Sequence, residues 1–106
     1  MSYKLIYAVE VFDDLQENID WYNKKQSRLG SRFFKAVKDQ TIRIKKSPFS
    51  AAVRYDDVRC AKVEGFPYLL HYKIFEDINT IKVIAVFSTH RNPLIWEERS
   101  SNRTKP

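Results

Sequence analysis

The sequence predicts one α+β domain, in which a small twisted antiparallel sheet is covered on one face by an N-terminal antiparallel helical hairpin. Three observations lead to this prediction. A short run of β-branched and aromatic residues is followed by two stretches with the 3.6-residue apolar period of helices. From residue 53 onward the apolar period changes to two, which is typical of strands. A chain of 106 residues, 43% of them apolar, is long enough for one core and too short for two.

The first expected elements are a strand and a helix. Residues 3–9 mix β-branched and aromatic side chains, and we expect them to form the strand. Asp14 is predicted to cap the helix, because Glu17 stands three residues later and completes a capping box. Leu15 and Ile19 then begin the apolar face with which the helix packs.

A second helix is expected after a short turn at residues 27–30, with Ser27 as its cap. Its apolar stripe includes Val37, and Pro48 ends it because the residue before a proline is disfavoured in the α conformation. Two helices joined by so short a turn must lie antiparallel. We expect the aromatic residues of both helices to be buried in the core: Trp21, Tyr22, Phe33 and Phe34.

Three strands joined by hairpins are expected next, at residues 58–63, 68–75 and 81–88. The last of them is apolar on both faces, which predicts a central strand covered on both sides. The N-terminal strand is expected to insert beside a later strand, which gives the order β-α-α-β-β-β. A short C-terminal helix is expected to begin near Pro93 and to pack Trp96 on the core.

The composition excludes several classes of protein. Cys60 is the only cysteine, so an internal disulfide is impossible and a reducing compartment, the cytoplasm, is expected. The N-terminus lacks the pattern of a signal peptide, and no stretch approaches the roughly 18 apolar residues of a membrane span. With two glycines and two histidines, neither a phosphate-binding loop nor a metal site is indicated, and no cofactor is expected. We expect a single domain at residues 1–99 and a flexible tail at residues 100–106.

Positive charge is concentrated in one segment of the chain. The sequence has 19 basic and 13 acidic residues, a net charge of +6. Residues 22–46 hold nine basic residues and one acidic residue, whereas residues 1–21 hold one basic and five acidic residues. Such a segment attracts a phosphate backbone or an acidic protein, although single lysines and arginines also commonly do no more than solvate a helix.

Several motifs, taken in order, carry a resemblance to a known family. They are Asp14-Leu15, Ile19-Asp20-Trp21-Tyr22, Leu29-Gly30-Ser31-Arg32-Phe33, residues 66–74, residues 84–93, and Trp96 with Arg99 after them. Together with the order of the elements, this set covers residues 1 to about 99. It resembles the RelE/ParE family of bacterial toxins from type II toxin–antitoxin systems, and it is more similar to the ParE-like branch of plasmid-stabilisation toxins.

The resemblance implies the expected fold and two competing activities. RelE-like members cleave messenger RNA in the ribosomal A site, whereas ParE-like members bind and poison DNA gyrase. Both are silenced by a cognate acidic antitoxin, so a toxin–antitoxin hetero-oligomer is expected. Gyrase inhibition is the leading hypothesis, because no tyrosine follows Tyr72 and the late catalytic tyrosine of many RelE-like nucleases has no counterpart. The alternatives are a ribosome-dependent mRNA endonuclease and a degenerate toxin that only binds its antitoxin.

A metal-free ribonuclease has to deprotonate a 2′-hydroxyl, stabilise a pentavalent phosphate and protonate the leaving oxygen. The candidates for this chemistry, or for binding a target, lie on the late strands and just after them: Arg59, Lys62, His71, Lys73, His90 and Arg91. Arg59, His90 and Arg91 would form the catalytic set, and hairpin pairing is expected to place Arg59 and His71 or Lys73 on one sheet face. Two structural alternatives stay open: His71 could be an ordinary mid-strand residue, and His90 and Arg91 could belong to a turn.

Overall fold

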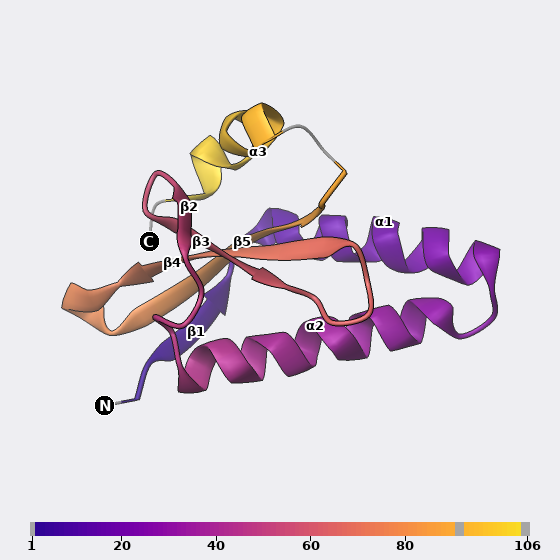
Figure 1. The fold of residues 1–106 in the computed structure, drawn as a ribbon, viewed down its shortest axis with the longest axis horizontal. Helices are drawn as coiled ribbons and strands as arrows, with labels where there is room; N and C mark the ends of the chain where they lie inside the picture. Colours follow the sequence, from indigo (N-terminus) through magenta and orange to yellow (C-terminus); the bar gives the residue numbers. More distant parts are fainter. Residues whose placement is uncertain (1, 91–92, 105–106) are drawn as a thin grey trace.

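The computed structural model describes residues 2–90 and 93–104 of the chain (Figure 1). Their helices and strands follow in this order: β1 (Lys4–Tyr7), α1 (Val9–Lys25), α2 (Leu29–Lys46), β2 (Val53–Tyr55), β3 (Val58–Lys62), β4 (Tyr68–Phe75), the 3-10 helix η1 (Glu76–Ile78), β5 (Thr80–Ser88), α3 (Pro93–Ser100) and the 3-10 helix η2 (Ser101–Arg103). Within this part of the chain, no helix combines the length and the apolar character that crossing a membrane requires.

The sheet is mixed and has the strand order β1-β5-β4-β3-β2. Strands β2 to β5 pair antiparallel, whereas β1 runs parallel to β5, with Lys4 opposite Thr80 and Tyr7 opposite Val83. Strand β1 is therefore the exception to the antiparallel pairing expected for the sheet. A hairpin turn forces antiparallel pairing, but β1 is linked to the other strands through the whole helical hairpin, and so long a connection permits a parallel pair. The α+β class, the helical hairpin and the insertion of β1 beside a later strand are confirmed.

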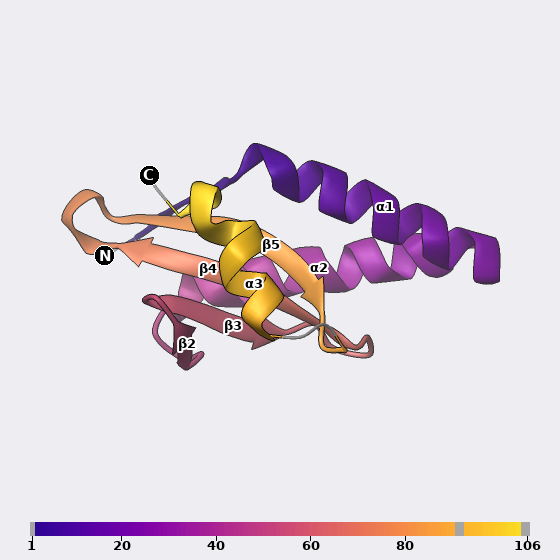
Figure 2. The ribbon, with the colours of Figure 1, turned by 90° about the horizontal axis from the view of Figure 1, so that it is seen from above.

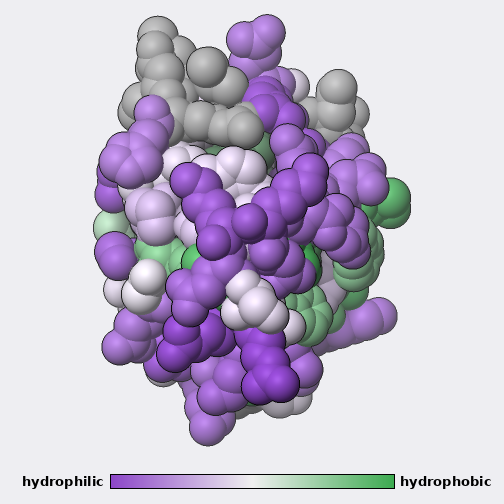
Figure 3. Space-filling model, turned by 90° about the vertical axis from the view of Figure 1, so that its right-hand side faces the viewer, coloured by the Kyte–Doolittle hydropathy of each residue, from purple (hydrophilic) through white to green (hydrophobic). Residues whose placement is uncertain are grey.

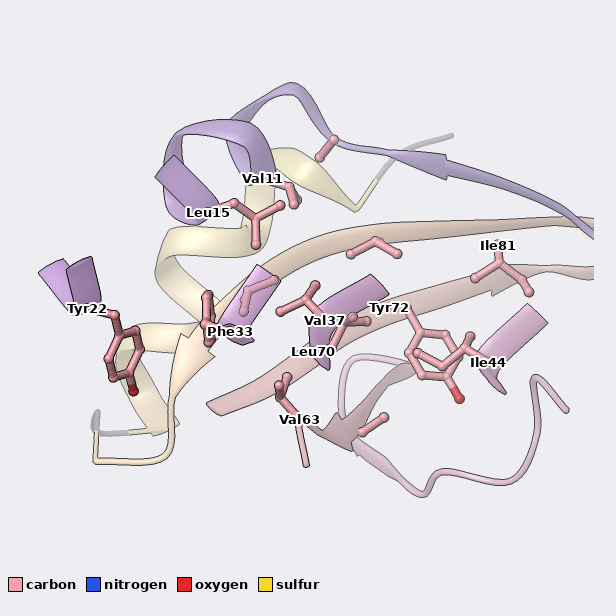
Figure 4. Close-up of a cluster of buried hydrophobic side chains, with 14 residues drawn as sticks. Val11, Leu15, Tyr22, Phe33, Val37, Ile44, Val63, Leu70, Tyr72 and Ile81 are labelled. Atoms are coloured by element: carbon pink, nitrogen blue, oxygen red, sulfur yellow. The ribbon is translucent and has the colours of Figure 1, made fainter. Parts of the chain in front are cut away.

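Helices cover both faces of the sheet (Figures 1 and 2). Helices α1 and α2 lie on one face, and α3 lies on the other. The larger core fills the space between the hairpin and the sheet, where Phe33 of α2 and Leu70 of β4 are fully buried (Figure 4). A smaller buried cluster under α3 includes Phe87 and Trp96. Strand β5 is thus covered on both sides, as its continuous apolar sequence predicts.

Helix α1 begins earlier than its predicted capping box. It starts at Val9, directly after β1, so Asp14 lies in its second turn and does not cap it. The Ala8 N–H donates to the Val83 carbonyl at 2.8 Å and extends the pairing of β1 with β5 up to the helix. The pairing of the strands therefore sets where the helix starts, and it overrides the local capping signal.

Two residues of the tail expected at residues 100–106 are buried, namely Ser100 and Arg103. The last two residues lie outside the described ones, and the flexibility of the tail stays a prediction. The Arg103 guanidinium donates to the Ile84 carbonyl at 3.1 Å. Ile84 is the first β5 residue that follows the part of the strand paired with β1. The guanidinium also pairs with the Asp14 carboxylate at 2.9 Å, and the two side chains are only 9% and 11% exposed. These contacts join Arg103 to α1 and β5.

Helices α1 and α2 approach each other closely at Gly30. A Cβ atom there would clash with the Ile19 carbonyl oxygen and lie 2.6 Å from Asn23 Oδ1, which accepts a hydrogen bond from the Gly30 N–H at 2.8 Å. Gly30→Ala should therefore lower the free energy of unfolding by about 2–3 kcal/mol, because overpacking and the loss of this bond act together. Urea denaturation followed by circular dichroism measures the change, and an unaltered midpoint would contradict the close approach.

Candidate functional site

The strand register separates the candidate residues onto the two faces of the sheet. Arg59 lies opposite Tyr72, and Cys60 lies opposite His71. Residues opposite each other in antiparallel strands share a face, and neighbours along a strand alternate between faces. Arg59 therefore lies on the face covered by the helical hairpin, while His71 and Lys73 lie on the face under α3. The expectation that Arg59 shares a face with His71 is therefore wrong, whereas Arg59 and Lys73, despite the register, line one hollow of about 280 Å³.

His71 is fully buried and belongs to a polar cluster beneath α3. Its Nδ1 lies 2.9 Å from the Tyr55 hydroxyl and 3.4 Å from Cys60 Sγ. The Tyr55 hydroxyl lies 3.0 Å from Ser100 Oγ, which itself donates to the Trp96 carbonyl at 2.6 Å. Because the Ser100 proton is used in that last bond, Tyr55 donates to Ser100 and His71 Nδ1–H to Tyr55 in the arrangement compatible with it, which leaves His71 Nε2 buried without a partner among the described residues.

Burial shifts the pKa values of two side chains in this cluster toward their uncharged forms. Burial lowers the pKa of His71 to about 3, and the nearby positive charge of Arg54 acts in the same direction. The imidazole is therefore neutral at physiological pH. Burial likewise raises the pKa of the Cys60 thiol to about 11, so the thiol stays protonated. His71 is thus buried and hydrogen-bonded, as the alternative of a mid-strand structural residue expects, and its contact with a target stays a prediction.

Arg59 is engaged in internal contacts as well. Its guanidinium donates to the carbonyls of Ala51 at 2.6 Å and Phe49 at 3.3 Å, and it lies over the Phe49 ring at 5.1 Å from the ring centroid. These contacts hold the loop between α2 and β2 against the sheet. Both hydrogen bonds come from one terminal nitrogen of the guanidinium, and Arg59 also lines a hollow of about 280 Å³.

The remaining candidates are accessible but spread out. Lys62 and His90 are exposed and Lys73 is half-buried. Lys62 and His90 lie toward the same end of the sheet, because β3 ends and β4 begins beside the end of β5. Lys73 is four residues along β4 from Leu69, the partner of Lys62, which is about 13 Å along a strand. Arg91 lies outside the described residues, and among the described ones no group of three or more His, Cys, Asp or Glu side chains could hold a metal ion.

An apolar groove that sequence reasoning missed lies between β1, α1 and α2. Its volume is about 240 Å³, and apolar atoms form nearly all of its lining, which comes from Tyr7, Phe12, Leu15, Phe34, Val37, Lys38 and Thr41. A second hollow of about 370 Å³ is lined by Ser2, Tyr3, Ile42, Lys45 and Lys46. Successive turns of α2 line the two hollows. An apolar surface bordered by lysines therefore continues along this helix.

Two of the four helix aromatics predicted to be buried are exposed, and one of these, Phe34, lines the groove. Tyr22 and Phe33 are buried as predicted, whereas Trp21 is 48% and Phe34 is 41% exposed. Consecutive helix residues point about 100° apart, so only one member of each adjacent pair can face the core. This spacing is the signal in the sequence that could have identified both exposed positions.

The fold has relatives among solved structures. A structure of the chromosomal ParDE toxin–antitoxin system from P. aeruginosa matches with a TM-score of 0.72 and 13% identity, over 82% of this chain and 96% of that chain. A double mutant of the E. coli toxin RelE in the free state matches with a TM-score of 0.71 and 18% identity, over 97% and 98% of the two chains. The chain has the RelE/ParE toxin fold.

A second RelE structure agrees with this result. The isolated E. coli RelE toxin matches with a TM-score of 0.63 and 19% identity, over 96% of this chain and 98% of that chain. No protein-family model matches the sequence, and no curated protein matches it. The RelE/ParE resemblance carried by the sequence motifs is thus confirmed at the level of the fold, and the fold by itself does not select one activity.

Proposed function

We propose that the chain is the toxin of a type II toxin–antitoxin system and that it acts by binding a protein target, DNA gyrase. The fold shared with the ParDE and RelE structures supports the first part. One observation carries the preference for binding over catalysis. Arg59 and His71, two of the candidates for nuclease chemistry, lie on opposite faces of the sheet, and both are held by internal contacts.

A metal-free ribonuclease needs several charged or titratable groups within reach of one phosphate. His71 is neutral and buried, and Lys73 lies far along the strand from Lys62. Arg59 and Lys73 line one hollow, but neither His71 nor His90 is part of that lining. A toxin that inhibits by binding a protein needs no such convergence, because a few well-placed surface residues supply most of the binding energy. The distribution of these side chains therefore favours a binding mechanism.

We propose that an acidic segment of the antitoxin occupies the apolar groove. Phe12 and Phe34 are exposed there, and contiguous exposed apolar surface marks interaction sites. Lys38 borders the groove, and Lys45 and Lys46 border the hollow that follows it. A segment that carries both apolar and acidic residues would bury the first in the groove and pair the second with these lysines.

Phe34→Asp is expected to weaken binding of the co-encoded antitoxin by about 30-fold or more, because a central aromatic contact contributes about 2 kcal/mol or more. Ile78→Asp is the matched control, since Ile78 is also about half-exposed but lies on η1. Titration calorimetry measures both affinities. Rapid mixing should in addition give an association rate that falls steeply as salt increases. Equal losses in the two variants would place the antitoxin elsewhere.

A supercoiling assay tests the proposed target. Purified gyrase should lose its ability to supercoil relaxed plasmid when the purified protein is added, and prior addition of the antitoxin should restore it. Undiminished supercoiling in a large molar excess of the protein would refute gyrase as the target.

Cleavage of messenger RNA is the second candidate function, and one observation favours it. Lys62 and His90 are both exposed toward the same end of the sheet, where a phosphate could approach them. His90→Ala would then abolish cleavage of ribosome-bound messages without lowering the melting temperature. Primer extension on messages isolated after induction measures this cleavage directly.

A further inference from the structure

The end of the helical hairpin carries an unbalanced positive charge. From Trp21 to Lys38 the sequence contains six basic residues and no acidic residue. Four of these cations surround the turn and, with Trp21, define the hairpin tip: Lys24, Lys25, Arg28 and Arg32. All of them are exposed, and none has an ion pair within the part of the chain that the structure describes. Figure 3 faces this end of the molecule, where hydrophilic side chains cover most of the surface.

Two local rules of helix stability are broken at the tip. Arg28, and not Ser27 as predicted, is the N-cap residue of α2, and its φ of 68° lies in the left-handed region that favours glycine. Asn23, and not Arg28, supplies the side-chain acceptor for the first turn of α2, and this turn has no acidic residue. Instead, Arg28 and Arg32 add positive charge at the positive end of the helix dipole. Proteins break several local rules at one place chiefly where function requires it.

Trp21 adds an aromatic surface among these cations. Its ring packs edge-on against Tyr22, with 5.0 Å between the centroids, so the core holds it in place while about half of the residue stays exposed. Lys25 Nζ lies 4.3 Å from the centroid of the same ring. Cations that neutralise phosphates beside a ring on which a base can stack are the combination that recognises single-stranded nucleic acid.

We propose that the hairpin tip binds single-stranded nucleic acid, with its four cations on the phosphates and Trp21 stacked on a base. A duplex offers phosphates but keeps its bases stacked inside, and an acidic peptide offers carboxylates but no base. The indole ring therefore favours the single strand over both. This inference goes beyond the proposed binding of gyrase and does not depend on it, because purified protein and an oligonucleotide suffice for its test.

Fluorescence anisotropy with a labelled single-stranded DNA of about 12 nucleotides, a length within the usual site sizes, tests the proposal. The four cations should neutralise four phosphates. A plot of the logarithm of the binding constant against the logarithm of the salt concentration should then have a slope of about −3. Arg28→Gly should reduce the slope to about −2 and at the same time raise the melting temperature, since glycine relieves the left-handed backbone. Trp21→Ala should weaken binding about fivefold or more and leave the slope unchanged.

The matched control replaces Lys45 and Lys46 together by alanine. Both are exposed, and they lie about 25 Å from Arg28 at the other end of α2. This variant should retain the affinity and the salt dependence of the wild type. The proposal is overturned if the oligonucleotide does not bind at low salt, or if the control loses as much affinity as Arg28→Gly. It is also overturned if a duplex of the same length or a polyglutamate peptide binds as tightly as the single strand.

Discussion

Replacing Arg103 by alanine is expected to lower the free energy of unfolding by about 3–5 kcal/mol, the usual result of removing one partner from a buried ion pair. The Asp14 carboxylate would stay almost buried without the guanidinium, and the Ile84 carbonyl would lose a donor. Because small domains have a total stability of about 5–15 kcal/mol, this one change should leave the domain close to unfolding at physiological temperature.

The surface ion pair between Arg43 and Glu64 provides the control. Its atoms are 3.3 Å apart, but the two side chains are 57% and 79% exposed. Exposed pairs of this kind contribute about 1 kcal/mol or less, so Arg43→Ala should change the stability little. Guanidinium denaturation of both variants gives the comparison. If the two substitutions had equal effects, the C-terminal segment would not be attached to α1 and β5 as described.

The stability of the domain is also expected to decrease steeply as the pH falls from about 6.5. The pKa of His71 is lowered from 6.5 to about 3 on folding. Between these values the unfolded chain binds a proton that the folded chain does not, so the stability is complete above the higher value and is lost as the pH falls toward the lower one. The slope should reach about 1.4 kcal/mol per pH unit, and the total loss from this group about 5 kcal/mol at most.

Urea denaturation at a series of pH values measures this slope. His71→Gln removes the buried imidazole and should flatten the dependence above about pH 5, where few carboxyl groups titrate. His90→Gln removes the exposed imidazole and should retain the dependence. A wild-type NMR titration gives a second readout that needs no variant: the His71 ring resonances should not shift between pH 7 and about 5. A shift in that range would contradict a buried, neutral His71.

The architecture could be predicted because most of it is encoded locally. The apolar period of α2, the short turn before it and the alternation along β3 and β4 each depend on a few neighbouring residues. The parallel pairing of β1 and the docking of Arg103 could not be predicted, since both depend on contacts between distant parts of the chain. Arg103 and Asp14 are 89 residues apart. The edge strand β2, with only three residues, is too short to give a periodic signal.

The candidate site could be predicted only as a set of residue types. Alternation within one strand is readable from sequence, but the register between strands decides which residues share a face, and that register depends on turns and bulges. The β4–β5 pair has such an irregularity between His71 and Tyr72. The apolar groove could not be predicted for another reason. Its lining comes from β1, α1 and α2, and the way in which these three elements pack together cannot be read from local sequence patterns.

The order in which DNA synthesis and protein synthesis stop after induction tests most directly whether the protein blocks gyrase or cleaves RNA. Cells are pulse-labelled with thymidine and, in parallel, with methionine during the first minutes after the protein is induced. Binding of gyrase predicts that thymidine incorporation falls first, while messages stay intact and methionine incorporation continues. An earlier fall in methionine incorporation, together with cleaved messages, would contradict the gyrase mechanism and establish the nuclease in its place.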